Sequence, residues 1–153
     1  MMRLFYIPHR QESGGIYSSD IIYTPGVVVL RTDDDEMEVL PANRRYQVDV
    51  ITCAAPNLNW TIVEDDELYM IQKERIGRVV DVAASNRAES LVLGAFGCGV
   101  FGNDPAIVAK ASKDVLSERP GCFRKVVFAI YGNRENLSAF KEAFGRRARR
   151  SLP

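Results

Sequence analysis

One stretch near the middle of the chain, LVLGAFGCGVFGNDP from Leu91 to Pro105, constrains the fold more than any other. An apolar run leads into glycines at positions 94, 97, 99 and 102, and Asn-Asp-Pro then opens a segment with helical spacing. Glycine permits positive φ and close approach of the backbone, and proline suits the first position of a helix. The stretch therefore predicts a strand, a glycine loop and a helix in direct succession.

The flanking segments extend this pattern to an α/β fold. Apolar residues recur with helical spacing over 64–86, over 104–118, and in a closing helix with Leu137, Phe140 and Phe144 along one face. Strands are predicted over 90–95 and from Arg124 onward. Strands that alternate with helices along the chain favour an α/β sandwich with right-handed crossovers.

The first half of the chain carries two further strand signals. The run YQVDVITCAAPN, residues 46–57, is almost continuously apolar and indicates a strand buried on both faces. Upstream, Thr24-Pro25-Gly26 separates two β-branched runs and predicts a turn between them. No repeat or linker divides the chain, so one domain is expected.

The glycine loop has a functional and an architectural interpretation. At the carboxyl end of a strand, backbone N–H groups of such a loop can hold an anionic diphosphate. A tight connection from strand to helix could also require glycines with no ligand. Phe101 is either a platform beside a sugar or base, or a plug between the loop and the next helix.

Two common phosphate-binding classes are disfavoured. The loop lacks the Lys and Ser/Thr of a P-loop, so nucleotide hydrolysis is unsupported. An acidic residue about 20 positions after the loop, as in dinucleotide dehydrogenases, is also not evident.

Composition excludes several other classes. The 153 residues contain 20 basic and 20 acidic side chains, so no overall charge attracts nucleic acid or membrane. The basic end, GRRARR, reads as a solvated last helical turn. The single histidine and the scattered Cys53, Cys98 and Cys122 predict no metal site, and no cofactor is expected. The cysteines are typical of small buried residues, which fits a reducing cytoplasm. No apolar run is long enough to span a bilayer, so a cytoplasmic protein is expected.

The residues also resemble a known family. SLVLGAFGCGVFGNDPAIVAKASKDVL, with VDVITCAAPN upstream and KVVFAIYG downstream, is similar to the microbial-type poly(ADP-ribose) glycohydrolases, a branch of the macrodomain fold. The likeness runs from about Tyr17 to Phe144. It implies a macrodomain-like three-layer α/β/α sandwich with a mixed sheet and with N-terminal elements missing. The expected organisation is an irregular segment over 1–16 and a single domain over 17–148.

The resemblance implies an ADP-ribose site. Its diphosphate-binding loop would contain Gly97, Cys98, Gly99, Val100, Phe101, Gly102 and Asn103, with Phe101 beside the proximal ribose. Ala55, Pro56 and Asn57 would lie along the same cleft, and Tyr131 and Asn133 near the adenosine end.

The catalytic acid is where the chain departs from the family. Family enzymes carry a Gly-Gly-Gly segment followed by Gln-Glu-Glu, whose glutamate is the acid; here RQESGG places Gln11 and Glu12 before the glycines. The catalytic residue is therefore unknown, and we expect a protein that binds ADP-ribose or ADP-ribosylated protein. The alternatives are a glycohydrolase whose acid comes from a partner chain or from Glu12, and a scaffold without ligand. The open sheet edge is expected to be covered by a partner chain, by self-association, or by a rearranged N-terminus in which residues 1–16 substitute for the missing elements.

Overall fold

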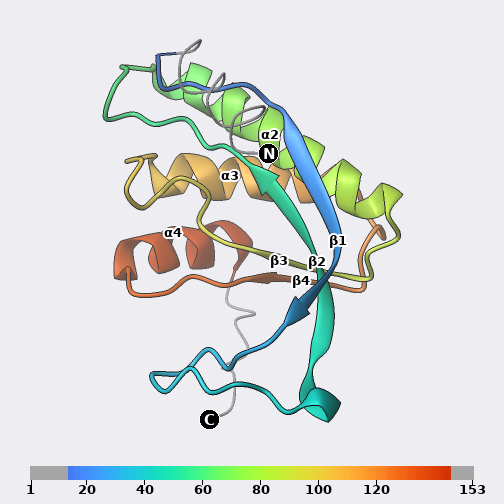
Figure 1. Cartoon of the computed structure of the whole chain (residues 1–153). Helices are drawn as coiled ribbons and strands as arrows, with labels where there is room; N and C mark the ends of the chain where they lie inside the picture. Colours follow the sequence, from blue (N-terminus) through green and yellow to red (C-terminus); the bar gives the residue numbers. More distant parts are fainter. Residues whose placement is uncertain (1–13, 146–153) are drawn as a thin grey trace.

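The computed structural model describes residues 14–145 of the chain (Figure 1). Glu12 and most of the basic stretch at the carboxyl end therefore lie outside the described residues. Within them the elements follow the order β1, η2, β2, α2, β3, α3, β4, α4.

The first two strands form an antiparallel ribbon. β1, Ile21–Val29, pairs with β2, Tyr46–Cys53, and η2, the short 3-10 helix Ala42–Arg44, lies between them. The turn expected at Thr24-Pro25-Gly26 is wrong, because β1 runs through these residues as one strand with a bulge between Thr24 and Val27. Gly26 adopts a φ of 66° there, and its N–H donates to Asp49 Oδ1 at 2.9 Å. Asp49 across the ribbon thus stabilises a bulge where the dipeptide alone suggested a reversal.

The second pair of strands is parallel. β3, Ser90–Leu93, pairs with β4, Lys125–Phe128, so that Leu91 lies opposite Val126. Parallel and antiparallel pairing are thus both present, as expected for a mixed sheet. In residues 14–145, however, they form two separate two-stranded sheets, because no ladder joins β2 to β3.

Three helices lie within residues 14–145, close to their predicted positions. α2 is Asp65–Ser85, α3 is Pro105–Ser117 and α4 is Arg134–Phe144. Figure 1 shows them stacked with α3 between α2 and α4, and α3 contacts both. No described helix has both the length and the apolar character needed to cross a membrane.

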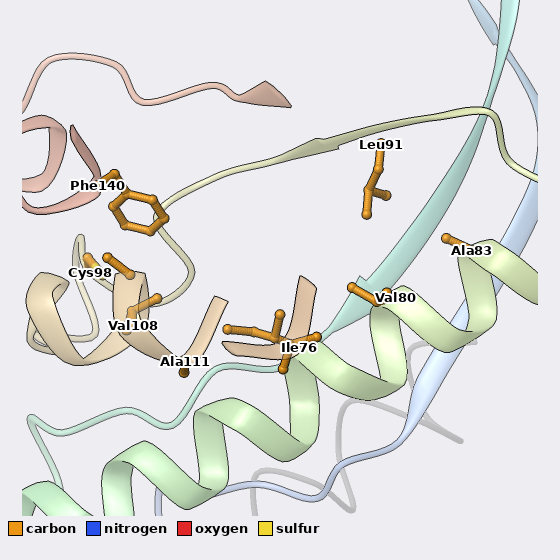
Figure 2. Close-up of a cluster of buried hydrophobic side chains, with 10 residues drawn as sticks. Ile76, Val80, Ala83, Leu91, Cys98, Val108, Ala111 and Phe140 are labelled. Carbon is orange, nitrogen blue, oxygen red and sulfur yellow. The ribbon is translucent and has the colours of Figure 1, made fainter. Parts of the chain in front are cut away.

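The core lies between these helices and β3. It joins Ile76, Val80 and Ala83 of α2 to Leu91 of β3, Cys98 of the glycine loop, residues of α3, and Phe140 of α4 (Figure 2). Phe128 of β4 extends it, with its ring centroid 4.9 Å from Phe140 and 4.8 Å from Phe144. Phe140 is buried, whereas Leu137, expected on the same face, is 37% exposed.

The described helices cover one face of β3. Leu91 points into the core at 9% exposure, whereas the next residue, Val92, is 68% exposed on the opposite face. The prediction that β2 is buried on both faces is wrong, since Tyr46, Val48 and Val50 are 57%, 39% and 38% exposed. β2 has β1 on one edge and contacts α2, and no other described element covers its second face.

Candidate anion-binding loop between β3 and α3

The glycine loop, residues 94–104, packs against the segment that follows β2. Leu58 N–H donates to Phe101 O at 2.9 Å, and Asn59 Nδ2 donates to Val100 O. Asn57 is 7% exposed, and its Oδ1 accepts from both the backbone N–H and Nδ2 of Asn59. The structure therefore packs the loop against the segment that follows β2, and the prediction that residues 55–57 line a ligand cleft stays a prediction.

Asn103 holds the loop from inside. Its side chain is 2% exposed, and Nδ2 donates to the carbonyls of Pro56 at 2.7 Å, Gly97 at 3.0 Å and Phe101 at 3.3 Å. Its Oδ1 accepts from Gln72 Nε2 at 2.7 Å. Because both N–H donors of the Asn103 amide are engaged inside the protein, they are not available to a ligand. The side chain joins three segments, and the prediction that Asn103 belongs to the ADP-ribose site stays a prediction.

Gly97 is required by packing. Its φ is 79°, and a Cβ there would lie 2.7 Å from both Ala55 Cβ and Asn103 Nδ2. Its carbonyl accepts from Asn103 N–H at 3.1 Å, which closes the base of the loop. Both a left-handed backbone and a close approach thus exclude a side chain at this position.

Part of the loop's backbone is bonded within the loop itself. Three predicted ligand-facing amides are bonded within the loop: Cys98 N–H to Ala95 O, Gly102 N–H to Gly99 O, and Asn103 N–H to Gly97 O, each at 3.1 Å.

The amides of Gly99, Val100 and Phe101 have no hydrogen-bond partner among residues 14–145. A Cβ on Gly99 would meet nothing within 4 Å, and Val100 is 88% exposed. Three consecutive unpaired N–H groups beside open space can bind an anion by donating hydrogen bonds to it.

The N-terminus of α3 is already capped. Asp104 Oδ1 accepts from Ala106 N–H at 2.7 Å and from Ile107 N–H at 3.1 Å. A carboxylate at this position occupies the donors that a helix N-terminus otherwise offers to a phosphate. Any anion at this end of β3 would therefore be held by the loop amides rather than by the helix.

Two aromatic rings flank the loop. Phe101 is partly buried, and its ring centroid lies 6.2 Å from that of Tyr17 with an interplanar angle of 37°. The contact gives Phe101 a protein neighbour before β1, which is not the neighbouring helix of the plug interpretation. Its exposed portion keeps the platform interpretation open.

Cys98, a buried residue of the loop, is chemically protected. Burial raises the pKa of its thiol to about 12, and the nearby Asp104 acts in the same direction. Since the thiolate is the reactive form, Cys98 contributes packing rather than nucleophilic chemistry. Asn136 of α4 approaches it from the other side, with Nδ2 at 3.5 Å from Cys98 O.

Arg75, which the sequence reasoning missed, anchors the segment before β1. It is 2% exposed, and donates to Ala54 O at 3.0 Å, Ile16 O at 2.6 Å and Tyr17 O at 2.7 Å. Burial lowers the pKa of its guanidinium. By binding the carbonyls of residues 16 and 17, Arg75 holds in place the backbone that carries Tyr17, the neighbour of Phe101.

The remaining predicted contacts stay predictions. Tyr131 is fully exposed after β4. Asn133 caps α4, since its Oδ1 accepts from Glu135 N–H at 2.9 Å and Asn136 N–H at 3.1 Å. No group of three or more His, Cys, Asp or Glu side chains in the described part of the chain could hold a metal ion.

Comparison with solved structures identifies the fold of the chain. The chain superimposes on poly(ADP-ribose) glycohydrolase from Deinococcus radiodurans in complex with ADP-ribose with a TM-score of 0.81, at 37% identity over 93% of this chain. The fold is that of the microbial poly(ADP-ribose) glycohydrolases. The Thermomonospora curvata glycohydrolase gives a TM-score of 0.83 at 34% identity over 94% of this chain, and its complex with the inhibitor ADP-HPD gives 0.82.

The likeness covers part of each glycohydrolase. The chain spans 59% of the Deinococcus structure and 54% of the Thermomonospora structure. The predicted family resemblance and α/β fold are confirmed over nearly all of this chain. No protein-family model matches the sequence, and no curated protein matches it.

Proposed function

We propose that the chain binds ADP-ribose, free or attached to protein, through the open amides of the glycine loop. The observation that carries this proposal is that the N–H groups of Gly99, Val100 and Phe101 have no partner within residues 14–145, where a Cβ on Gly99 would meet no atom within 4 Å. The diphosphate would accept from these amides, and Phe101 would lie beside the adjoining ribose. A glycohydrolase of the same fold is bound to ADP-ribose.

A second candidate is glycohydrolase activity. Cleavage of a ribosyl bond needs a carboxylic acid placed to protonate the leaving oxygen. The carboxylate nearest the loop in sequence, Asp104, is engaged in capping α3. The sources that we propose for the acid are a partner chain and Glu12, which lies outside the described residues.

Calorimetric titration with ADP-ribose tests binding. Gly99→Ala and Gly99→Leu place progressively larger side chains in the proposed diphosphate space, and should weaken binding in that order while the melting temperature is retained. Gly77→Ala on α2 is the control, because its Cβ would meet only the flexible Arg119 side chain, at 3.3 Å. No heat of binding for the unaltered chain would favour the scaffold alternative, and equal affinity for all four proteins would exclude the loop.

Release of ADP-ribose from a modified protein tests catalysis separately. Turnover by the chain alone would support Glu12, which Glu12→Gln should then abolish. Turnover only after addition of a second polypeptide would place the acid on that polypeptide.

We further propose a cytoplasmic location and a single macrodomain-like domain over 17–148. Cys53, Cys98 and Cys122 are all free thiols, as is usual in a reducing compartment. One continuous core joins α2, β3, α3 and α4, which supports a single domain.

A further inference from the structure

A hollow of about 600 Å³ lies between the two sheets, and it does not include the glycine loop. One wall is the β1–β2 ribbon, through Val48, Asp49 and Ile51 among others, and the other is β3 over 90–93. Val79 and Ala83 of α2 contribute to its lining. Figure 1 shows the ribbon crossing beside the β3–β4 pair.

Both walls end in an unpaired strand edge. Within residues 14–145, β2 pairs only with β1 and β3 only with β4. Leu93 O accepts from Ala129 N–H at 2.7 Å, so the backbone groups of Leu93 point toward β4. Because these groups alternate along a strand, those of Ser90 and Val92 point to the opposite edge, toward the hollow.

These two edges carry few of the features that keep exposed edges from pairing: Asp49 is the one charged side chain in β2, and β3 has none. Proline, lysine and bulges are the usual means, and β1 has both Pro25 and a bulge. The sequences of β2, YQVDVITC, and β3, SLVL, contain no proline, glycine or lysine. The edges that face the hollow are therefore chemically suited to accept a strand.

The side chains around the hollow define what kind of strand fits. Ile51, Leu91 and Leu93 are apolar and line it, and Val92 is 68% exposed beside it. The polar side chains of the lining are Gln47, Asn86, Ser90 and the Tyr23–Asp49 pair, in which the hydroxyl donates to Asp49 Oδ2 at 2.7 Å; the other lining side chains are apolar. A strand with mainly apolar side chains matches this lining, whereas a charged one would be buried without a partner.

We propose that the hollow is a docking slot for one extended, mainly apolar strand that pairs with β2 and β3 together. Its source is a polypeptide carrying the portion of the glycohydrolase fold without a counterpart in this chain. The solved glycohydrolases support this source, because 41% of the Deinococcus chain (100 minus 59) is not covered by this chain. Inserting one strand would join the two separate pairs into a single mixed sheet. The proposal does not depend on ADP-ribose binding.

The test mixes the 153-residue chain with the portion of the Deinococcus glycohydrolase that it does not cover. Light scattering should show a one-to-one complex, and hydrogen exchange should slow at the amides of Ser90 and Val92. Val92→Lys places a charge at the slot and should weaken the complex about tenfold or more. Ile62→Lys is the control, because Ile62 is 95% exposed and does not line the hollow.

Three results would overturn the proposal. The first is no complex at micromolar concentrations with both proteins folded, and the second is equal weakening by Val92→Lys and Ile62→Lys. The third is a dimer of the chain alone that protects Ser90 and Val92 and is dissociated by Val92→Lys, since a second copy would then occupy the slot.

Discussion

Replacing Gln72 by glutamate tests whether the glycine loop is held by a dry amide pair. Gln72 is fully buried, and its Nε2 is the donor to Asn103 Oδ1 at 2.7 Å. A glutamate has the same shape, but its carboxylate can only accept, so it would face the Asn103 oxygen with no proton between them. Only the protonated acid restores the donor.

The expected effect is a pH-dependent loss of stability. Burial and the Asn103 oxygen both favour the neutral acid, so the folded-state pKa of Glu at position 72 should lie above the unfolded value of about 4.3. The free energy of unfolding, relative to the unaltered chain, is then retained below about pH 4.3. It falls by about 1.4 kcal/mol per pH unit as pH rises toward the folded pKa. If that pKa exceeds 7, the loss at pH 7 is about 4 kcal/mol.

Urea unfolding between pH 4.5 and 8, with variant and unaltered chain measured side by side, gives this difference directly. Gln72→Leu is the matched control, because it removes the same donor without a titrating group and should cost about 1–2 kcal/mol at every pH. A Gln72→Glu penalty that does not change with pH would refute the reasoning. It would mean that the carboxylate stays ionised and hydrated when folded, so the amide pair would not be dry.

Three further predictions concern the loop and the residues around it. Gly97→Ala should lower the free energy of unfolding by about 2–4 kcal/mol, because it combines left-handed backbone strain with two contacts at 2.7 Å. Gly99→Ala, measured in the same thermal melts, should change the free energy of unfolding by less than about 0.5 kcal/mol. Asp104→Ala removes both cap bonds of α3 and should cost about 1 kcal/mol, measured by chemical denaturation; no loss would show that the cap is dispensable. Iodoacetamide at pH 8 should label the exposed Cys122 in the folded protein and reach Cys98, with its pKa of about 12, only after denaturation, as peptide mass spectrometry would show.

Local signals predicted most of the second half of the chain. Pro105 stands at the first position of α3 with Asp104 as its cap, where turn chemistry and apolar spacing agree. The same agreement places β3 before the loop and α4 after β4. Such elements are specified by residues close together in sequence, so one sequence suffices to predict them.

The first half was harder to predict because its structure depends on distant partners. The run 46–57 is apolar enough for a central strand, but its exposure depends on which elements cover it, and that is not a local property. The Thr24–Gly26 segment became a bulge because Asp49, across the ribbon, accepts its free N–H. Neither outcome has a signal within the segment itself.

Gln72 and Arg75 could have been found from spacing. Both lie on the face of α2 that carries Leu68, Ile76 and Val80, where every other buried side chain except Gly77 is apolar. A polar residue on the apolar stripe of a helix must find partners when it is buried. That rule would have identified both residues as anchors, although not the carbonyls and amide that they bind.

The glycines of this loop do not all have the same role. Gly97 and Asn103 face inward and are fixed by contacts with Ala55 and Gln72, so any fold with this connection would need them, with or without a ligand. Gly99 faces open space and next to it are amides that the described protein leaves unpaired, so packing gives no reason for a glycine there. The architectural interpretation therefore accounts for Gly97 but not for Gly99. It is the second glycine, rather than the pattern as a whole, that argues for a ligand at this loop.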